Sequence, residues 1–527
     1  MKKNIILDII NKHNLNIYDY ENYTSEIVKV IDYKQNSNQG KLVIVTSMNP
    51  TPVGEGKTTT SIGLIDGLNK IGIKAIGSLR EPSIGPVFGM KGTGSGSNMA
   101  KLLPFDKINL HFTGDFHAIT TANNLISAVI ENEIYQNSSL DIDPNKIVWK
   151  RCMDMNDRSL RNIEYSISEK KSSLVSTSFN ITAASDLMAL FCLCKSKKDF
   201  INKINETIVA FNKDNQPITI KDLEISNAIA DIMNDAFYPN LVRTLEDNLV
   251  FVHGGPFANI AHGCSSLISI NAALDLGDVV ITEAGFGSDL GLEKFMNITC
   301  QVGKLDPRLI VLVVSLKSIL YNGNDFGQTN KEKIDAGFEN ILHHIEHAKQ
   351  YGINLIVAIN HRNEDLDEDM QYLNSLLQKH NIEYSWSDGW AQGSDGTIDL
   401  SNKVKNILEN DNKDHYKSLY KVDDSLLDKI STISKNVYGA DKVIFNDLAQ
   451  QKINDYSKYR NYYVCISKNP YSLTCNPKIL GKPKNFNTTI EDVEINHAAK
   501  LIIPITSVVY RMPGLPKVPA AKNFIIK

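Results

Sequence analysis

Short runs of Val, Ile and Leu alternate with segments of helical periodicity along most of this chain. The runs that we predict to be strands cover residues 42–47, 74–79, 249–254, 278–285, 309–315 and 354–360. Because these runs are continuously apolar rather than alternating, they are typical of parallel strands buried on both faces. Helical patterns lie between them, for example over residues 58–71 and 331–352. This order predicts an α/β fold with a mostly parallel, doubly wound sheet.

The pattern changes after the last of these apolar runs. A polar segment, NHRNEDLDEDM, begins at the end of the run at 354–360, and a helical stretch near 425–435 leads into a part with mixed strands. We therefore expect one large, P-loop-like α/β domain over residues 1–330 and two smaller α/β domains over 331–420 and 421–527. A chain of 527 residues is long enough for three domains of ordinary size.

Composition is that of a soluble globular protein and excludes several classes of partner. Hydrophobic residues make up 42% of the sequence, and 56 basic residues against 60 acidic ones give a net charge of −4. This balance provides no general attraction to nucleic acid or to an anionic membrane. No apolar run approaches the roughly 20 residues that a membrane span needs. We expect a cytoplasmic protein whose scattered cysteines are reduced.

The segment NPTPVGEGKTTTSIGL, directly after the first predicted strand, has the organisation of a phosphate-binding loop. Its glycines allow backbone N–H groups to face an anion, and the start of the next helix adds partial positive charge. Lys57 can reach the terminal phosphates of a nucleotide, and Thr58 offers a hydroxyl to Mg²⁺. Thr51 stands where the G-x-x-x-x-G-K-[ST] pattern has its first glycine, so a simple glycine turn with a solvated lysine is the alternative. The predicted nucleotide-binding residues are Gly54, Glu55, Gly56, Lys57, Thr58 and Thr59.

Two further segments place chemically active side chains near predicted strand ends. Arg80 can bind an acyl phosphate or a carboxylate with two N–H groups, although a structural pair with Glu81 is the better explanation for this dipeptide alone. The glycine-rich stretch that begins at Lys91 could close over anions. Asp115 and His117 can handle protons or ions, but such residues are equally common as hydrogen-bonded core groups.

Nine sequence blocks resemble those of one enzyme family. They are NPTPVGEGKTTTSIGL, REPSIGPVFGMKG, INLHFTGDFHAI, DMNDRSLR, PNLVRTLE, FVHGGPFANIAHG, TEAGFGSDLGLEKF, NVYGAD and MPGLPKVPAA. In amino-acid sequence and in order they are similar to the blocks of the formate–tetrahydrofolate ligases, and the resemblance covers nearly the whole chain. That family makes 10-formyltetrahydrofolate, ADP and phosphate from formate, ATP and tetrahydrofolate through formyl phosphate. The resemblance therefore implies ATP and Mg²⁺, tetrahydrofolate as co-substrate, a monovalent cation and a homotetramer.

The resemblance also implies roles for single residues in the reaction. Lys57 and an Mg²⁺ ion held by Thr58 would neutralise charge on the γ-phosphate that formate attacks. Arg80 matches the position that clamps formyl phosphate, and this raises its functional interpretation above the structural one. Asp115 falls in an active-site block and is assigned to the transfer of the formyl group to the folate amine.

Two aromatic residues match positions near the family's pterin site. A flat heteroaromatic ring needs faces to stack on, and Phe286 and Trp390 would provide them. Either residue could instead be an ordinary core aromatic. With these assignments, residues 1–330 are the expected nucleotide-binding domain, 331–420 the folate-side domain and 421–527 the C-terminal domain.

Several positions depart from the family pattern. In each case this chain has a different residue from the one that the family pattern has. Thr93 stands for a glycine, Asn98 or Met99 for a tyrosine, Lys317 for an arginine, Leu320 for a lysine, Asn322 for a histidine, Arg362 for an aromatic residue and Val508 for an aspartate. These changes leave open a related ligase with a different carboxylate or amine acceptor, or a catalytically silent relative that binds nucleotide. The retained residues of the nucleotide end favour a folate ligase over both alternatives.

Overall fold

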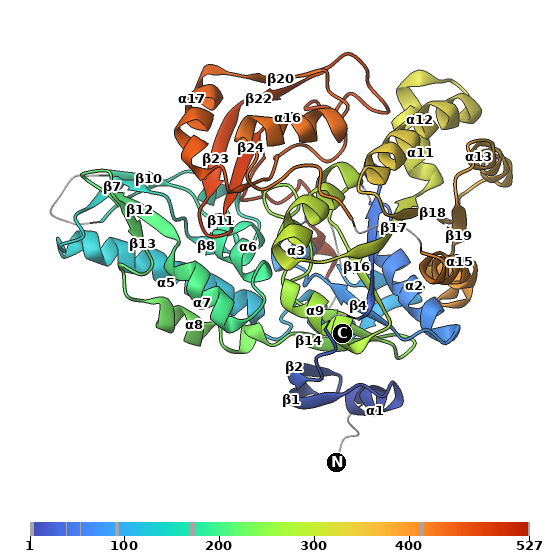
Figure 1. The fold of residues 1–527 in the computed structure, drawn as a ribbon, viewed down its shortest axis with the longest axis horizontal. Helices are drawn as coiled ribbons and strands as arrows, with labels where there is room; N and C mark the ends of the chain where they lie inside the picture. Colours follow the sequence, from blue (N-terminus) through green and yellow to red (C-terminus); the bar gives the residue numbers. More distant parts are fainter. Residues whose placement is uncertain are drawn as a thin grey trace.

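A large mixed sheet forms the centre of the computed structural model, which describes residues 5–37, 39–52, 54–89, 94–167, 174–411, 416–507 and 509–524 (Figure 1). Its strands follow the order β1 (Ile17–Thr24), β2 (Ile27–Tyr33), β14 (Asn240–Thr244), β15 (Leu249–Val252), β4 (Ala75–Leu79), β16 (Val279–Glu283), β3 (Lys41–Ser47), β17 (Pro307–Val314), β18 (Asn354–Asn360) and β19 (Tyr384–Ser387). All neighbours from β15 to β19 are parallel, whereas β1, β2 and β14 pair antiparallel. The predicted α/β class and all six predicted strands are confirmed.

The central strands are apolar throughout because helices cover both faces of the sheet. Val43 and Val45 of β3 pack in the core under α2 (Lys57–Lys70) and α15 (Ile398–Glu409). Leu42 and Ile44 of the same strand point to the other face and pack in a core with α9 (Leu267–Leu276). Successive side chains of a strand alternate between faces, so a strand between two helical layers needs an apolar residue at every position.

The large sheet continues beyond residue 330. Strands β18 and β19, which come from the segment 331–420, extend it past β17. Helix α12 (Asn330–Lys349) packs against α11 (Leu316–Gly323) beside this end of the sheet (Figure 1). The domain boundaries at 330 and 420 stay predictions.

Two smaller lobes flank the sheet and have hydrophobic cores of their own. One contains α5 (Asp115–Tyr135), α7 (Lys197–Asn205), α8 (Ser226–Ile232), β7 (Ile142–Ile147), β12 (Ile208–Asn212) and β13 (Pro217–Thr219). The C-terminal one contains α16 (Leu426–Asn436), α17 (Asp447–Asp455), β20 (Lys442–Phe445), β21 (Tyr463–Val464), β22 (Asn487–Ile490), β23 (Asp492–Asn496) and β24 (Leu501–Ile505). Within the described ranges, no helix combines the length and the apolar character required to cross a bilayer.

A buried ion pair connects the C-terminal lobe to the large sheet. Nζ of Lys468 lies 2.6 Å from the carboxylate of Asp289, and both side chains are 0% exposed. Asp289 lies in the π-helical turn Ser288–Leu292 that follows β16. Because either charge would be uncompensated without the other, this pair fixes how the lobe sits on the sheet.

We predict that Lys468→Met lowers the free energy of unfolding by about 3–5 kcal/mol, since the variant leaves the Asp289 carboxylate buried without a partner. Urea denaturation followed by circular dichroism would measure the change. Lys482→Met is the matched control, because within the described part of the chain the ion pairs of Lys482 are long, 3.8 Å and 3.6 Å, and go to the exposed Glu339 and Glu346. The control should cost less than about 1 kcal/mol; equal losses in the two variants would contradict the prediction.

Candidate active site

A cavity of about 960 Å³ lies at the carboxyl ends of the parallel strands. The loops that follow β3, β4, β16 and β18 contribute most of its lining, and the C-terminal tail closes one side. Ligands of open α/β sheets bind at this edge because the loops of adjacent strands converge there. The cavity is therefore the candidate active site.

The loop after β3 presents the start of α2 to this cavity. Gly54 and Gly56 both have positive φ, 84° and 77°. A Cβ on Gly56 would also come within 2.4 Å of Nδ2 of Asn360. Helix α2 begins at Lys57 without a side-chain cap, so the N–H groups of its first turn are available to an anion in the cavity.

Glu55 braces this loop from inside. Its carboxylate accepts a hydrogen bond from the backbone N–H of Thr51 at 2.6 Å and another from the Ser315 hydroxyl at 2.6 Å. Only 1% of Glu55 is exposed. The Glu55–Thr51 bond holds the start of the loop, where the common motif has a glycine, so the altered motif is compatible with an ordered loop. The oxygens of Glu55 are engaged by protein donors.

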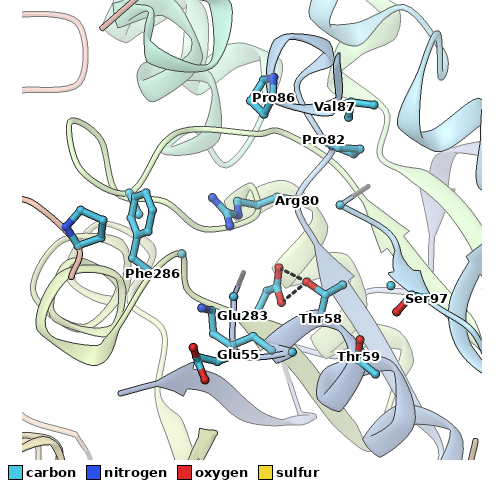
Figure 2. Close-up of a pocket in the computed structure, with 18 of the residues that line it drawn as sticks. Glu55, Thr58, Thr59, Arg80, Pro82, Pro86, Val87, Ser97, Glu283 and Phe286 are labelled. Atoms are coloured by element: carbon cyan, nitrogen blue, oxygen red, sulfur yellow. Dashed lines mark hydrogen bonds between the residues drawn. The ribbon is translucent and has the colours of Figure 1, made fainter. Parts of the chain in front are cut away.

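Thr58 meets a carboxylate that the sequence analysis did not select. Its Oγ1 donates to Oε2 of Glu283 at 2.9 Å, and Figure 2 shows this contact beside the loop. Glu283 is the last residue of β16, and β16 pairs with β3, the strand that precedes the loop. The sequence signal that could have identified Glu283 is its position, because it is an acidic residue directly at the end of the apolar run in DVVITEAG.

The threonine hydroxyl and the carboxylate are oxygen ligands of the kind that Mg²⁺ prefers. Within the described part of the chain, no group of three or more His, Cys, Asp or Glu residues could hold a metal ion. An Mg²⁺ ion here would therefore complete its shell with water and phosphate oxygens, as it commonly does beside nucleotides.

Two cationic side chains face the same cavity. Nζ of Lys57 donates to Oγ of Ser47 at 3.2 Å. The surrounding protein lowers the pKa of Lys57 mainly by desolvation, although part of the side chain is open to the cavity; Glu283 and Glu55 oppose this effect. The guanidinium of Arg80 donates to the carbonyl of Pro256 at 3.2 Å, and its Nε has no hydrogen-bond partner among the described residues.

Both aromatic residues that the resemblance selected, Phe286 and Trp390, line the cavity. Phe286 has φ of 58°, a left-handed conformation that is unfavourable for an aromatic residue, and its carbonyl accepts a hydrogen bond from Ser47. Figure 2 shows its ring beside Arg80. Trp390 is 42% exposed, and its carbonyl accepts hydrogen bonds from Nδ2 of Asn98 at 2.8 Å and from the N–H of Met99 at 3.2 Å.

Arg362 also lines the cavity, next to the glycine loop. Its Nη2 donates to the carbonyl of Gly54 at 3.0 Å. Three other positions that depart from the family pattern lie on α11 and do not line the cavity. They are Lys317, Leu320 and Asn322.

Neither of the two candidates for proton handling, Asp115 and His117, lines the cavity. Asp115 is the only one of the two to which the resemblance assigns a role. It is 2% exposed, lies 2.7 Å from Nζ of Lys29 and accepts a hydrogen bond from Asn240 at 2.7 Å. Its negative charge adds to burial in raising the pKa of Glu81 well above the usual range. Glu81 does line the cavity, so Asp115 can act on the site through this neighbour. Lys91 and Gly92 of the predicted anion loop, and the changes at Thr93 and Val508, lie outside the described residues, whereas Gly94 and Gly96 of the same loop line the cavity.

Comparison with known proteins agrees with this geometry. The family model described as formate–tetrahydrofolate ligase matches residues 1–527. A curated relative from Ureaplasma parvum, named formate–tetrahydrofolate ligase, is 56% identical over 526 residues, which cover 99% of this chain and 99% of the relative. Because both matches span essentially the whole sequence, this protein belongs to the formate–tetrahydrofolate ligase family.

Proposed function

We propose that the protein joins formate to tetrahydrofolate with ATP, forming 10-formyltetrahydrofolate, ADP and phosphate through formyl phosphate. The observation that carries this proposal is the convergence on one cavity of a phosphate-type loop, the cations Lys57 and Arg80, and the aromatic side chains of Phe286 and Trp390. Family membership and the name of the curated relative support the same activity.

The glycine loop, Lys57 and Thr58 form the proposed nucleotide end of the site. The N–H groups at the start of α2 would bind the phosphates, and Lys57 would balance the charge that develops on the γ-phosphate during attack by formate. Thr58 and Glu283 would hold Mg²⁺, which supplies a Lewis acid to the phosphate oxygens. Anionic phosphates beside Lys57 would also favour its charged form and so offset the desolvation that lowers its pKa.

Arg80 and the aromatic residues form the proposed acyl and acceptor end. The guanidinium of Arg80 is held by a carbonyl and has no carboxylate partner among the described residues, so it can bind formyl phosphate bidentately. Phe286 and Trp390 would stack on the pterin ring and exclude water from the hydrolysis-prone acyl phosphate. Asp115 would act as a positioning residue for the acceptor step, through its influence on Glu81.

A second candidate is a ligase with the same acyl phosphate chemistry and another amine acceptor. The observation that favours it is Arg362, which lies in the cavity where the resemblance implies an aromatic residue. Dependence on a monovalent cation, a homotetramer, the cytoplasmic location and the domain boundaries at 330 and 420 also belong to the proposal.

We predict that the purified protein releases ADP and forms a formylated folate only when Mg-ATP, formate and tetrahydrofolate are all present. ADP would be measured by a coupled assay, and the folate product by absorbance after acidification. Lys57→Met should lower kcat roughly 10²–10³-fold, because a preorganised charge at the γ-phosphate is lost. Turnover of ATP that ignores both formate and folate would contradict the proposed reaction, and dependence on a different amine would select the second candidate.

A pH profile tests the electrostatic role of Glu283. Of the influences that raise the pKa of Lys57, Glu283 is the largest, so Glu283→Gln should lower that pKa further. Lys57 is charged below its pKa and loses its charge as pH rises through it. The alkaline limb of kcat/KM for ATP, which reports the free enzyme, should therefore move to lower pH in the variant.

Asp143→Asn is the control for this profile, because Asp143 pairs with Lys146 on β7 and does not line the cavity. Its alkaline limb should coincide with that of the wild type. An unmoved limb in Glu283→Gln would show that Lys57 does not control the alkaline limb.

A further inference from the structure

Two of the resembling blocks, DMNDRSLR and MPGLPKVPAA, meet at one side of the cavity, and the reaction outlined above uses neither. Asn156 of the first block lines the cavity, as do Pro513 and Gly514 of the second. Tyr510, which comes just before the second block, also lines it. We call the contact between residues 154–161 and 510–515 the rim seam.

Two arginines of the first block hold the second block through backbone carbonyls. Nε of Arg161 donates to the carbonyl of Met512 at 2.9 Å, and Nη2 of Arg158 donates to the carbonyl of Leu515 at 2.6 Å. A Cβ on Gly514 would lie 2.5 to 2.7 Å from Nη2, Nε and Cζ of Arg158. These similar distances show that the guanidinium of Arg158 lies face-on against a residue of the cavity lining.

Arg161 also stacks on an exposed aromatic ring. Its Cζ lies 3.4 Å from the centroid of the Tyr510 ring, and Tyr510 is 54% exposed. This contact fixes the guanidinium beside the cavity while leaving much of the tyrosine open to a ligand. The rim seam thus presents an aromatic surface flanked by positive charge.

The charges of these two arginines are not balanced locally. Within the described residues, neither guanidinium forms an ion pair with a carboxylate; their hydrogen bonds go to carbonyl groups. Arg511 in the same seam differs, because it is paired with Glu494 and, at 3.6 Å, with Asp186. The carboxylate of the adjacent Asp157 accepts instead from the N–H and hydroxyl of Ser159.

We propose that the rim seam binds the benzoyl-glutamate tail of the folate, with Arg158 and Arg161 as the partners of its carboxylates and Tyr510 as a face for its benzoyl ring. The inference rests on the proposed function, which makes tetrahydrofolate a substrate. Tyr510 lines the same cavity as Phe286 and Trp390, so a single ligand can contact the pterin residues and the rim seam together. Arginine suits carboxylate recognition at such a place because its charge is permanent and its N–H groups form a planar fork.

The competing explanation is that the arginines only hold the C-terminal segment in place. Substitution by Gln separates the two ideas, because it removes the charge and keeps an N–H donor for the carbonyl. Arg161→Lys keeps the charge, so it should retain more tail recognition than Arg161→Gln.

The experiment compares three acceptors in wild type, Arg158→Gln, Arg161→Gln and the double variant. These acceptors are tetrahydropteroate, which lacks glutamate, tetrahydrofolate with one glutamate, and its triglutamate. KM and the equilibrium dissociation constant would be measured for each. We expect each single variant to weaken the glutamylated acceptors roughly threefold to fivefold, since the contacts are partly exposed to solvent. Binding of tetrahydropteroate and KM for ATP should not change, and the preference for triglutamate should fall with rising salt.

The control variant is Lys379→Gln, which removes one positive charge from the exposed end of α13 (Asp367–Lys379), away from the cavity lining. It should leave all three acceptors unchanged. The inference would be overturned if the arginine variants lost affinity for tetrahydropteroate and for the triglutamate by the same factor. The two arginines would then only hold the C-terminal segment in place. The inference would also be overturned if the wild-type protein formed product from all three acceptors with KM values that do not depend on the number of glutamates. Absence of product with every acceptor would instead refute the proposed function.

Discussion

The site depends on the parallel pairing of β3 and β16, which places a carboxylate beside the phosphate-type loop. Their register sets Glu283 opposite Val45, so the end of β16 lies next to the loop that follows β3. Thr58 then reaches Glu283 from the first turn of α2. Ser47, at the end of β3, accepts a hydrogen bond from Lys57 and donates one to the carbonyl of Phe286. One pair of strands therefore aligns the groups proposed for metal, nucleotide and pterin, and the helices on both faces keep that pair rigid.

The site also carries electrostatic and conformational costs that a bound anion and an aromatic ring can offset. Desolvation lowers the pKa of Lys57, and Arg80 has a buried Nε without a partner among the described residues. Phe286 keeps a left-handed backbone that costs roughly 1–3 kcal/mol for a residue with a side chain. The ion pair of Lys468 with Asp289 anchors the turn that follows Phe286, so that this turn cannot relax freely. Such costs are typical of binding sites, where the surrounding fold holds groups in positions that favour the ligand.

Local sequence patterns predicted the strands, the glycine loop and the start of α2, because each depends on residues that are neighbours in the chain. Contacts between distant segments were not predictable in this way. The partner of Thr58 lies 225 residues further along, and Lys29, which pairs with Asp115, lies 86 residues before it. The second contact explains why Asp115 does not line the cavity: its carboxylate is used to neutralise a buried lysine. Likewise, no local signal shows that β19 extends the large sheet past β18 or that the C-terminal tail reaches the cavity.

The altered positions gain meaning from where they lie. Lys317, Leu320 and Asn322 are on α11, outside the cavity lining, and Asn322 hydrogen-bonds to the carbonyl of Asn49 at 3.4 Å. A change at Asn322 can therefore act on ligands by shifting the start of the loop. Arg362 differs because it lines the cavity itself and holds the carbonyl of Gly54. A guanidinium is planar and stacks on aromatic faces, so an arginine can replace an aromatic ring beside a pterin while adding positive charge. The substitution that most directly suggests a different acceptor is therefore also compatible with a folate, and the identity of the acceptor depends on the balance between stacking and charge at this one side chain.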